Sequence, residues 1–341
     1  MIAPRNKISA RSRRISHYFF SFSGIFTIIL ILVLILTGAC TQKKPRQKVY
    51  LFSYFKNNGE DGLHLAYSPD GMEWTALNED KSFLRPEIGS QLMRDPSICR
   101  GPDDMFHIVW TTGWWDNGIG IAHSKDLINF SEQTFVPVMA DEPNAKNCWA
   151  PEIFYDRKSK QYLIFWATTI TGRFPETQDS GDNNHRIYVV TTRDFKQYSK
   201  AKLFYDPGFN VIDSFITGDG KRFVMFLKDE TKLPVAQKNV RVAFGDKADG
   251  PYGPASEPIT GNYWAEGPTA LKIKGRWVVY FDKYTERQYG AVTSENLEDW
   301  QDISETVEFP PGARHGTVFE VDKNIVDNLI TNSGTENNQG N

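Results

Sequence analysis

The sequence predicts an all-β protein, a five-bladed β-propeller closed by pairing of its N- and C-terminal strands. Two observations predict this fold. One pattern recurs along the chain at intervals of roughly 50 residues, the usual length of a blade of about four strands. In addition, no stretch after residue 48 has the apolar periodicity of an amphipathic helix of about 12 residues or more. Short strands between Gly, Asp and Pro turns agree with an all-β chain.

The repeated pattern is a short alternating strand followed by Ser or Thr, any residue and Asp, with an aromatic residue shortly afterwards. The fourth copy is degenerate, and the fifth has Asn in place of Asp. The copies end at Trp74, Phe130, Tyr198, Tyr252 and Trp300. Another apolar strand precedes each copy, at residues 49–55, 105–111, 162–167, 223–227 and 277–281. Because one sheet cannot bury both of its faces alone, we expect the blades to stack in a ring.

The ring is expected to close through the two ends of the chain. Inner strands are predicted at residues 94–101, 149–156, 211–217, 264–274 and 314–321. The fifth has no outer partners after residue 321, but unpaired strands are available at residues 49–55 and 63–67. Pairing them removes exposed sheet edges. The propeller domain is therefore predicted to span residues 48–321, followed by a polar, disordered tail at 322–341.

The N-terminal segment has the features of a secretory signal. Basic and polar residues precede an apolar run at 25–36, which is shorter than the ~20 residues needed to span a bilayer. Small residues then lead to Cys40. We interpret residues 1–40 as a lipoprotein-type signal segment with lipidation at Cys40, and residues 41–47 as a tether. An uncleaved N-terminal anchor is the alternative. Both interpretations place the domain outside the cytoplasm, attached to the membrane and facing the periplasm or the cell surface.

Each predicted inner strand carries an ionisable residue near its start. In order these are Asp95, Glu152, Asp213, Glu266 and His315. Inner strands of a propeller line one channel, so equivalent positions should converge at one mouth of it. Crowded carboxylates acquire divergent pKa values, as glycoside hydrolysis requires of its acid and its base. A simple turn is the alternative for any single Asp-Pro, and a calcium cluster is the alternative for the whole set.

At these strands the chain resembles glycoside hydrolase family 43, over residues 48–321. The resemblance rests on Arg94-Asp-Pro-Ser-Ile-Cys-Arg100, Trp149-Ala-Pro-Glu-Ile153, Val211-Ile-Asp-Ser-Phe215, Trp264-Ala-Glu-Gly-Pro268 and Arg314-His-Gly-Thr317. The family is a five-bladed propeller that hydrolyses glycosides with inversion. The resemblance implies that Asp95 is the general base, Asp213 the orienting carboxylate that tunes pKa, and Glu266 the general acid.

Further site residues are expected around this trio. Glu152 departs from the Asp or His that the family often has there, and we expect it to bind a sugar hydroxyl. Ser214 replaces a Pro that is common in the family. The resemblance implies no required cofactor, but a structural Ca²⁺ on the propeller axis near His315 is compatible with it. The other residues expected to bind substrate are Arg94, Trp114, Trp149, Trp264, Arg314 and His315.

The predicted function is an inverting glycoside hydrolase acting on side chains of plant or microbial polysaccharides. The motifs are most similar to those of exo-α-L-arabinofuranosidases and β-D-galactofuranosidases, with β-xylosidase as the alternative. A non-catalytic carbohydrate-binding propeller would not need the acid–base trio. A phosphorylase would use Arg94, Lys228 and Arg314 for phosphate. A net charge of -3 without a basic stripe argues against nucleic acid as a partner, and we expect a monomer that binds oligo- or polysaccharide.

Overall fold

The computed structural model describes residues 47–333. The predicted signal segment with Cys40, the tether up to residue 46, and residues 334–341 lie outside this range. Within the described range, no helix is long and apolar enough to cross a membrane.

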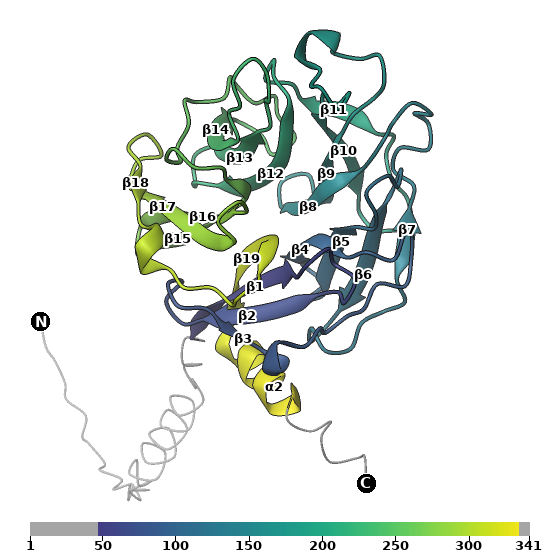
Figure 1. Cartoon of the computed structure of the whole chain (residues 1–341). Coiled ribbons are helices and arrows are strands. Elements are labelled where there is room, and N and C mark those ends of the chain that lie inside the picture. The colour runs from purple at the N-terminus through teal and green to yellow at the C-terminus, as the bar shows by residue number, and fades with distance from the viewer. Residues whose placement is uncertain (1–46, 334–341) are drawn as a thin grey trace, which may run out of the picture. The chain divides into compact units, whose positions relative to one another are not determined.

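The described chain forms five antiparallel sheets arranged around a centre (Figure 1), which confirms the predicted fold class. The first blade along the chain contains β4 (Arg94–Arg100), β5 (Phe106–Thr111), β6 (Ile119–Ser124) and β7 (Thr134–Val136). The second contains β8 (Trp149–Asp156), β9 (Gln161–Thr168), β10 (Arg186–Thr192) and β11 (Lys202–Tyr205). The third contains β12 (Val211–Gly218), β13 (Phe223–Asp229) and β14 (Asn239–Gly245). The fourth contains β15 (Glu266–Ile273), β16 (Arg276–Lys283), β17 (Gln288–Ser294) and β18 (Gln301–Asp302).

The last blade combines both ends of the described chain, as the sequence predicts. Its strand order is β19 (Arg314–Asp322), β1 (Lys48–Phe55), β2 (His64–Ser68) and β3 (Thr75–Ala76). β1 pairs with β19 in antiparallel register from Lys48↔Asp322 to Phe55↔Arg314. The inner strands β4, β8, β12, β15 and β19 contact one another in that order and close back onto β4. Pairing of the two ends therefore seals the ring.

The repeated Ser/Thr-x-Asp pattern builds the turn after the third strand of a blade. In the first copy, the hydroxyl of Ser68 accepts a hydrogen bond from the backbone N–H of Gly71 at 2.8 Å, and Asp70 accepts one from the N–H of Met72 at 2.8 Å. The same bonds recur after Ser124, Thr192 and Ser294. Short polar side chains that satisfy backbone donors favour turns over continued strands, which explains why the pattern marks the blades.

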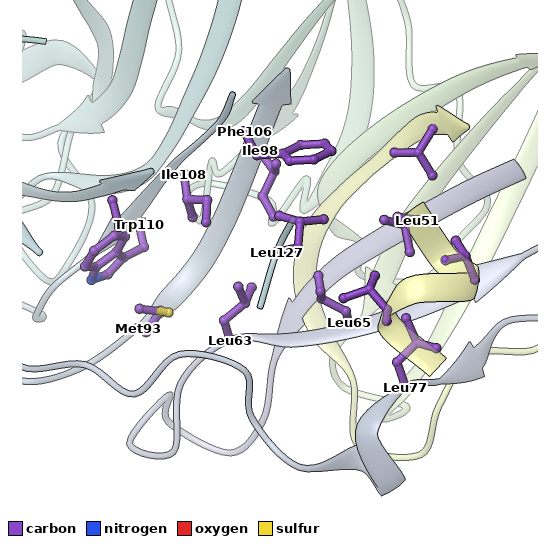
Figure 2. Packing of buried hydrophobic residues seen from close by; sticks show 14 of the residues in the cluster. Leu51, Leu63, Leu65, Leu77, Met93, Ile98, Phe106, Ile108, Trp110 and Leu127 are labelled. Atoms are coloured by element: carbon purple, nitrogen blue, oxygen red, sulfur yellow. The ribbon is translucent and has the colours of Figure 1, made fainter. Parts of the chain in front are cut away.

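The hydrophobic core is divided among the spaces between neighbouring blades. One cluster lies where the closing blade meets the blade of β4, and Figure 2 shows Leu51, Leu65, Ile98, Phe106 and Trp110 packed there. The second strands of the blades supply much of the core, because all six residues of β5 and most of β9, β13 and β16 are buried. Blades buried on both faces in this way form a rigid frame for the centre.

The C-terminal segment corrects one prediction. Residues 322–341 were expected to be disordered, but Asp322 belongs to β19 and Lys323–Ser333 form helix α2. Val326 and Leu329 are buried in the same cluster as Leu51. They lie three residues apart and therefore share one face of the helix. This narrow apolar stripe, among polar neighbours, was too short to stand out from composition alone. The short helices Asn78–Asp80, Pro175–Thr177 and Ser304–Thr306 complete the described elements.

Candidate active site

Every inner strand contains a β-bulge at the same place. In β4 the register passes from Arg94↔Thr111 to Ser97↔Val109, so the inner strand has one extra residue. The same shift occurs in β8, β12, β15 and β19. Asp95 and Asp213 lie in these bulges with φ of 52° and 50°. Bulges re-aim side chains, and here they face the centre of the ring. We call this position, with the adjacent Glu266, the bulge level.

The bulges correct the expected equivalence of the five ionisable residues. Asp95, Asp213 and His315 do occupy equivalent positions. The equivalent residue of β15 is Gly267, one residue after Glu266, and that of β8 is Ala150, two residues before Glu152. Gly267 has φ of 60°, and a Cβ there would lie 2.4 Å from the His315 ring, so only glycine fits. Repeat spacing locates the strands but does not reveal the extra residue within each of them.

A cavity of 280 Å³ opens above the bulges. The structure brings most of the predicted site residues together in its lining, including the trio Asp95, Asp213 and Glu266. The lining residues are Arg94, Asp95, Thr111, Trp114, Trp149, Ala150, Ile212, Asp213, Lys228, Glu230, Glu266, Tyr284, Arg314 and His315. Two predicted residues, Glu152 and Trp264, do not line it.

His315 connects two of the carboxylates. Its Nδ1 lies 3.4 Å from Oδ1 of Asp95 and 4.0 Å from Oδ1 of Asp213. Burial opposes the charged imidazolium, but the negative charges of Asp213 and Asp95 outweigh burial and raise the pKa of His315 to about 9. Burial also opposes ionisation of Asp95, yet its hydrogen bond to His315 and the charges of His315 and Arg94 lower the pKa of Asp95 to about 2. Asp95 is therefore ionised at neutral pH.

The pKa of Asp213 is shifted in the opposite direction from that of Asp95. Its Oδ2 accepts a hydrogen bond from the backbone N–H of Gly267 at 3.1 Å. Burial raises the pKa of Asp213 to about 6, and the negative charges of Glu266 and Asp95 act in the same direction. Two neighbouring carboxyl groups thus have pKa values that differ by several units, which is the divergence expected of an acid–base site.

Glu266 is held by two cations. Lys228 donates to Oε2 at 2.9 Å and Arg314 donates to Oε1 at 3.1 Å. Both cations have a second anionic partner, because Lys228 Nζ lies 2.8 Å from Glu230 and Arg314 Nε donates to Asp282 at 2.6 Å. This network of charge-assisted hydrogen bonds fixes the orientation of the Glu266 carboxylate.

Glu152, which was expected to bind a sugar hydroxyl, lies outside the cavity lining. Its carboxylate is buried and accepts hydrogen bonds from Ser97 of the adjacent inner strand β4 at 2.5 Å and from Thr317 of the inner strand β19 at 2.9 Å. Burial raises the pKa of Glu152 to about 7. Glu152, Ser97 and Thr317 each lie two residues past a bulge position, and we call this set the inner level. Glu152 ties three blades together beneath the cavity and is closed off from it.

Aromatic rings form one wall of the cavity. Trp114 and Trp149 meet edge to face with ring centroids 5.7 Å apart, and the indole N–H of Trp149 donates to the carbonyl of Trp114 at 2.8 Å. The Arg94 guanidinium lies 4.2 Å from the centroid of Trp114. Trp264 lies outside the lining, with its ring 6.0 Å from that of Tyr284, which does line the cavity.

Sequence reasoning missed Thr111 and Asp282, and it named Lys228 only as a phosphate ligand in the phosphorylase alternative. All three lie at or near the end of a second strand and pair directly with Arg94, Glu266 and Ile212, respectively. A polar residue that follows a buried apolar strand is the signal that could have found them. Thr111 shows their role, because its hydroxyl donates to Asp95 at 2.9 Å and accepts from the N–H of Ala150 at 2.9 Å.

For the structural Ca²⁺ that is compatible with the resemblance near His315, the described residues provide no cluster of ligands. Among residues 47–333, no group of three or more His, Cys, Asp or Glu side chains is placed to hold a metal ion. His315 instead contacts Asp95 and Asp213 directly.

A family model described as a probable glycosyl hydrolase domain, related to glycosyl hydrolase 43, matches residues 46–327. The chain belongs to this family. The match covers the whole propeller and continues into α2 up to residue 327. It therefore agrees with the finding that the folded chain continues past residue 321.

Relatives of known name share part of the chain. An α-L-arabinofuranosidase of Bifidobacterium longum is 23% identical over 183 residues, which is 47% of this chain and 17% of that protein. Xylosidase/arabinosidase 43B of Humicola insolens is 28% identical over 193 residues, which is 53% of this chain and 34% of that protein. The match thus spans about a third or less of these relatives. A solved α-L-arabinofuranosidase of Clostridium thermocellum has the same fold, with a TM-score of 0.56 at 14% identity, covering 76% of this chain and 90% of that one.

Proposed function

We propose that the chain is an inverting glycoside hydrolase that removes α-L-arabinofuranosyl units from polysaccharide side chains. The observation that carries this proposal is the cavity at the bulge level, where Asp95, Asp213 and Glu266 share one small space with an aromatic wall. The family match and the relatives named arabinofuranosidase support it.

The roles follow from the charge states and contacts. Asp95, ionised at neutral pH, is suited to accept a proton from the attacking water. Glu266, oriented by Lys228 and Arg314, is proposed to protonate the leaving oxygen. Asp213 is linked to both: His315 lies between Asp213 and Asp95, and the N–H of Gly267, the residue after Glu266, donates to Asp213. The raised pKa of Asp213 also makes it a candidate proton donor, so the two assignments need a direct test.

Leaving-group dependence separates the two candidate donors. A substrate with an activated aryl leaving group scarcely needs protonation, whereas a natural glycoside does. Glu266→Gln should therefore lose far less activity on dinitrophenyl than on alkyl α-L-arabinofuranosides, while Asp213→Asn should lose similar activity on both. The reverse pattern would move the acid role to Asp213.

β-Xylosides are a second candidate substrate, because three relatives carry names that include xylosidase. β-D-Galactofuranosides are the third. Purified protein should be screened against nitrophenyl α-L-arabinofuranoside, β-D-xyloside and β-D-galactofuranoside. We expect the highest kcat/KM on the arabinofuranoside. No turnover of any of the three, with retained binding of oligosaccharides, would favour the non-catalytic carbohydrate-binding alternative.

We also propose that the protein is anchored outside the cytoplasm through lipid on Cys40. The support is the basic segment, the apolar run at 25–36 and the small residues before Cys40. Metabolic labelling with a radioactive fatty acid should label the chain, and Cys40→Ser should abolish the label. Labelling that survives this substitution would contradict the proposal.

A further inference from the structure

The loop at 112–118, between β5 and β6, presents two adjacent tryptophans beside the cavity. Trp114 lines the cavity and is 42% exposed, whereas Trp115 lies outside the lining and is 67% exposed. Trp115 nonetheless contacts the cavity wall, because its ring centroid lies 6.0 Å from that of Trp149. Because the Trp115 side chain is mostly exposed, its ring face and indole N–H can be reached by a ligand.

Hydrogen bonds and close packing fix the loop that carries these rings. Oδ2 of Asp116 accepts hydrogen bonds from the hydroxyl of Thr112 at 2.7 Å and the N–H of Ser90 at 3.0 Å, and Oδ1 accepts one from the hydroxyl of Ser90 at 2.7 Å. A Cβ on Gly113 would lie 2.6 Å from that of Ser90, so the backbone is packed too closely for another residue. A large aromatic ring held rigidly in water loses little conformational entropy when a ligand covers it.

We propose that Trp115 forms a second sugar-binding subsite, which holds the sugar unit next to the one in the cavity. This inference rests on the proposed function, and it extends the substrate class from a terminal glycoside to an oligosaccharide. The cavity holds the terminal sugar, so the neighbouring unit on the leaving-group side must leave the cavity past its rim. Trp115 offers that unit an apolar face and an N–H donor, one ring beyond Trp149. The apolar face of a sugar ring can stack on an indole.

Binding measurements on the full chain test the subsite separately from catalysis. Affinities should be measured by calorimetry in a Glu266→Gln background for arabinose, xylose, and their α-1,5- and β-1,4-linked oligosaccharides of two to five units. We expect the affinity for one of the two series to rise from the monosaccharide to the disaccharide. Trp115→Ala should weaken oligosaccharide binding about tenfold, corresponding to about 1.4 kcal/mol, and leave monosaccharide binding unchanged. Trp115→Phe should retain part of the gain.

Leu203→Ala is the matched control, because Leu203 is 45% exposed on the outer strand β11 and should leave all affinities unchanged. Equal loss for monosaccharides and oligosaccharides in Trp115→Ala, unchanged oligosaccharide affinity, or no gain with chain length in the parent protein would each overturn the subsite. Failure of the aryl glycoside screen would instead overturn the proposed hydrolase activity, and the binding data would remain interpretable.

Discussion

The inner strands hold buried carboxyl groups at two levels, and the difference between them shows how the propeller separates chemistry from structure. At the bulge level, Asp95 and Glu266 line a cavity and are oriented by His315, Lys228 and Arg314. At the inner level, two residues past a bulge position, both oxygens of Glu152 accept hydrogen bonds from hydroxyl groups of two other blades, Ser97 on the neighbouring β4 and Thr317 on β19.

The same residue type therefore has two different uses, set by its place relative to the bulge. A bulge turns its residue out of the regular ladder and toward the centre. Past the bulge, regular pairing resumes, and the carboxyl group of Glu152 is bound there by hydroxyl groups of two other inner strands, β4 and β19. Glu152 is accordingly proposed to hold the ring together, and the bulge-level carboxylates to perform the reaction.

The largest expected effect separates the two levels by activity. Asp95→Asn and Glu266→Gln should each lower kcat/KM for the natural substrate by ~10²–10⁴, because each removes a proton-transfer group. Glu152→Gln should change kcat/KM by only a few fold, since Glu152 does not line the cavity. Steady-state kinetics on the three variants decide the matter. An equally large loss in Glu152→Gln would show that the two levels are not functionally distinct.

The next effect concerns stability. The pKa of Glu152 is raised by burial to about 7, so the native state retains its proton at pH values where the unfolded chain, near 4.5, has lost it. The contribution of Glu152 to the free energy of unfolding must therefore fall as pH rises from about 4.5 to about 7. Glu152→Gln removes this titration.

The variant should gain stability relative to the parent protein across that pH range, by up to about 3 kcal/mol at about 1.4 kcal/mol per pKa unit. Chemical denaturation at pH 4.5, 6 and 8 would measure the difference. A difference that does not change with pH would mean that Glu152 ionises normally in the folded protein.

A smaller effect is expected at Thr111, which connects the bulges of two blades. Thr111→Val removes the donor to Asp95 and the acceptor for the N–H of Ala150. Loss of one such buried hydrogen bond costs about 1–3 kcal/mol, and kcat/KM should fall about tenfold as Asp95 loses its fixed orientation. Thr293→Val is the control, because its hydroxyl also makes one buried hydrogen bond, to Trp277, but in an outer strand. If both variants lower activity equally, Thr111 has no particular role in positioning Asp95.

The sequence was sufficient to predict the ring and its closure, because each blade repeats a turn whose hydrogen bonds depend on local residues such as Ser68 and Asp70. It was not sufficient to place Glu152. The spacings between inner strands include loops of different lengths, so an offset of one or two residues within a strand cannot be read from them.

The places of Lys228 and Asp282 beside Glu266 could not be predicted for a different reason. Each enters the site from a second strand, through its pairing with Ile212 or Glu266. That register becomes known only once the hairpins are built. Helix α2 was missed because its buried stripe rests on Val326 and Leu329, too few apolar residues to outweigh the polar composition of the tail.

The stereochemistry of the reaction tests the central claim most directly, because Asp95 is proposed to activate water and not to attack the sugar itself. An inverting site places its two carboxyl groups about 6.5–9.5 Å apart to admit that water, whereas a retaining site places them about 5 Å apart. Proton NMR of the first product formed from an α-L-arabinofuranoside distinguishes the two. If Asp95 activates water, β-L-arabinofuranose is released first. Initial release of the α anomer would contradict the role of Asp95 as a general base.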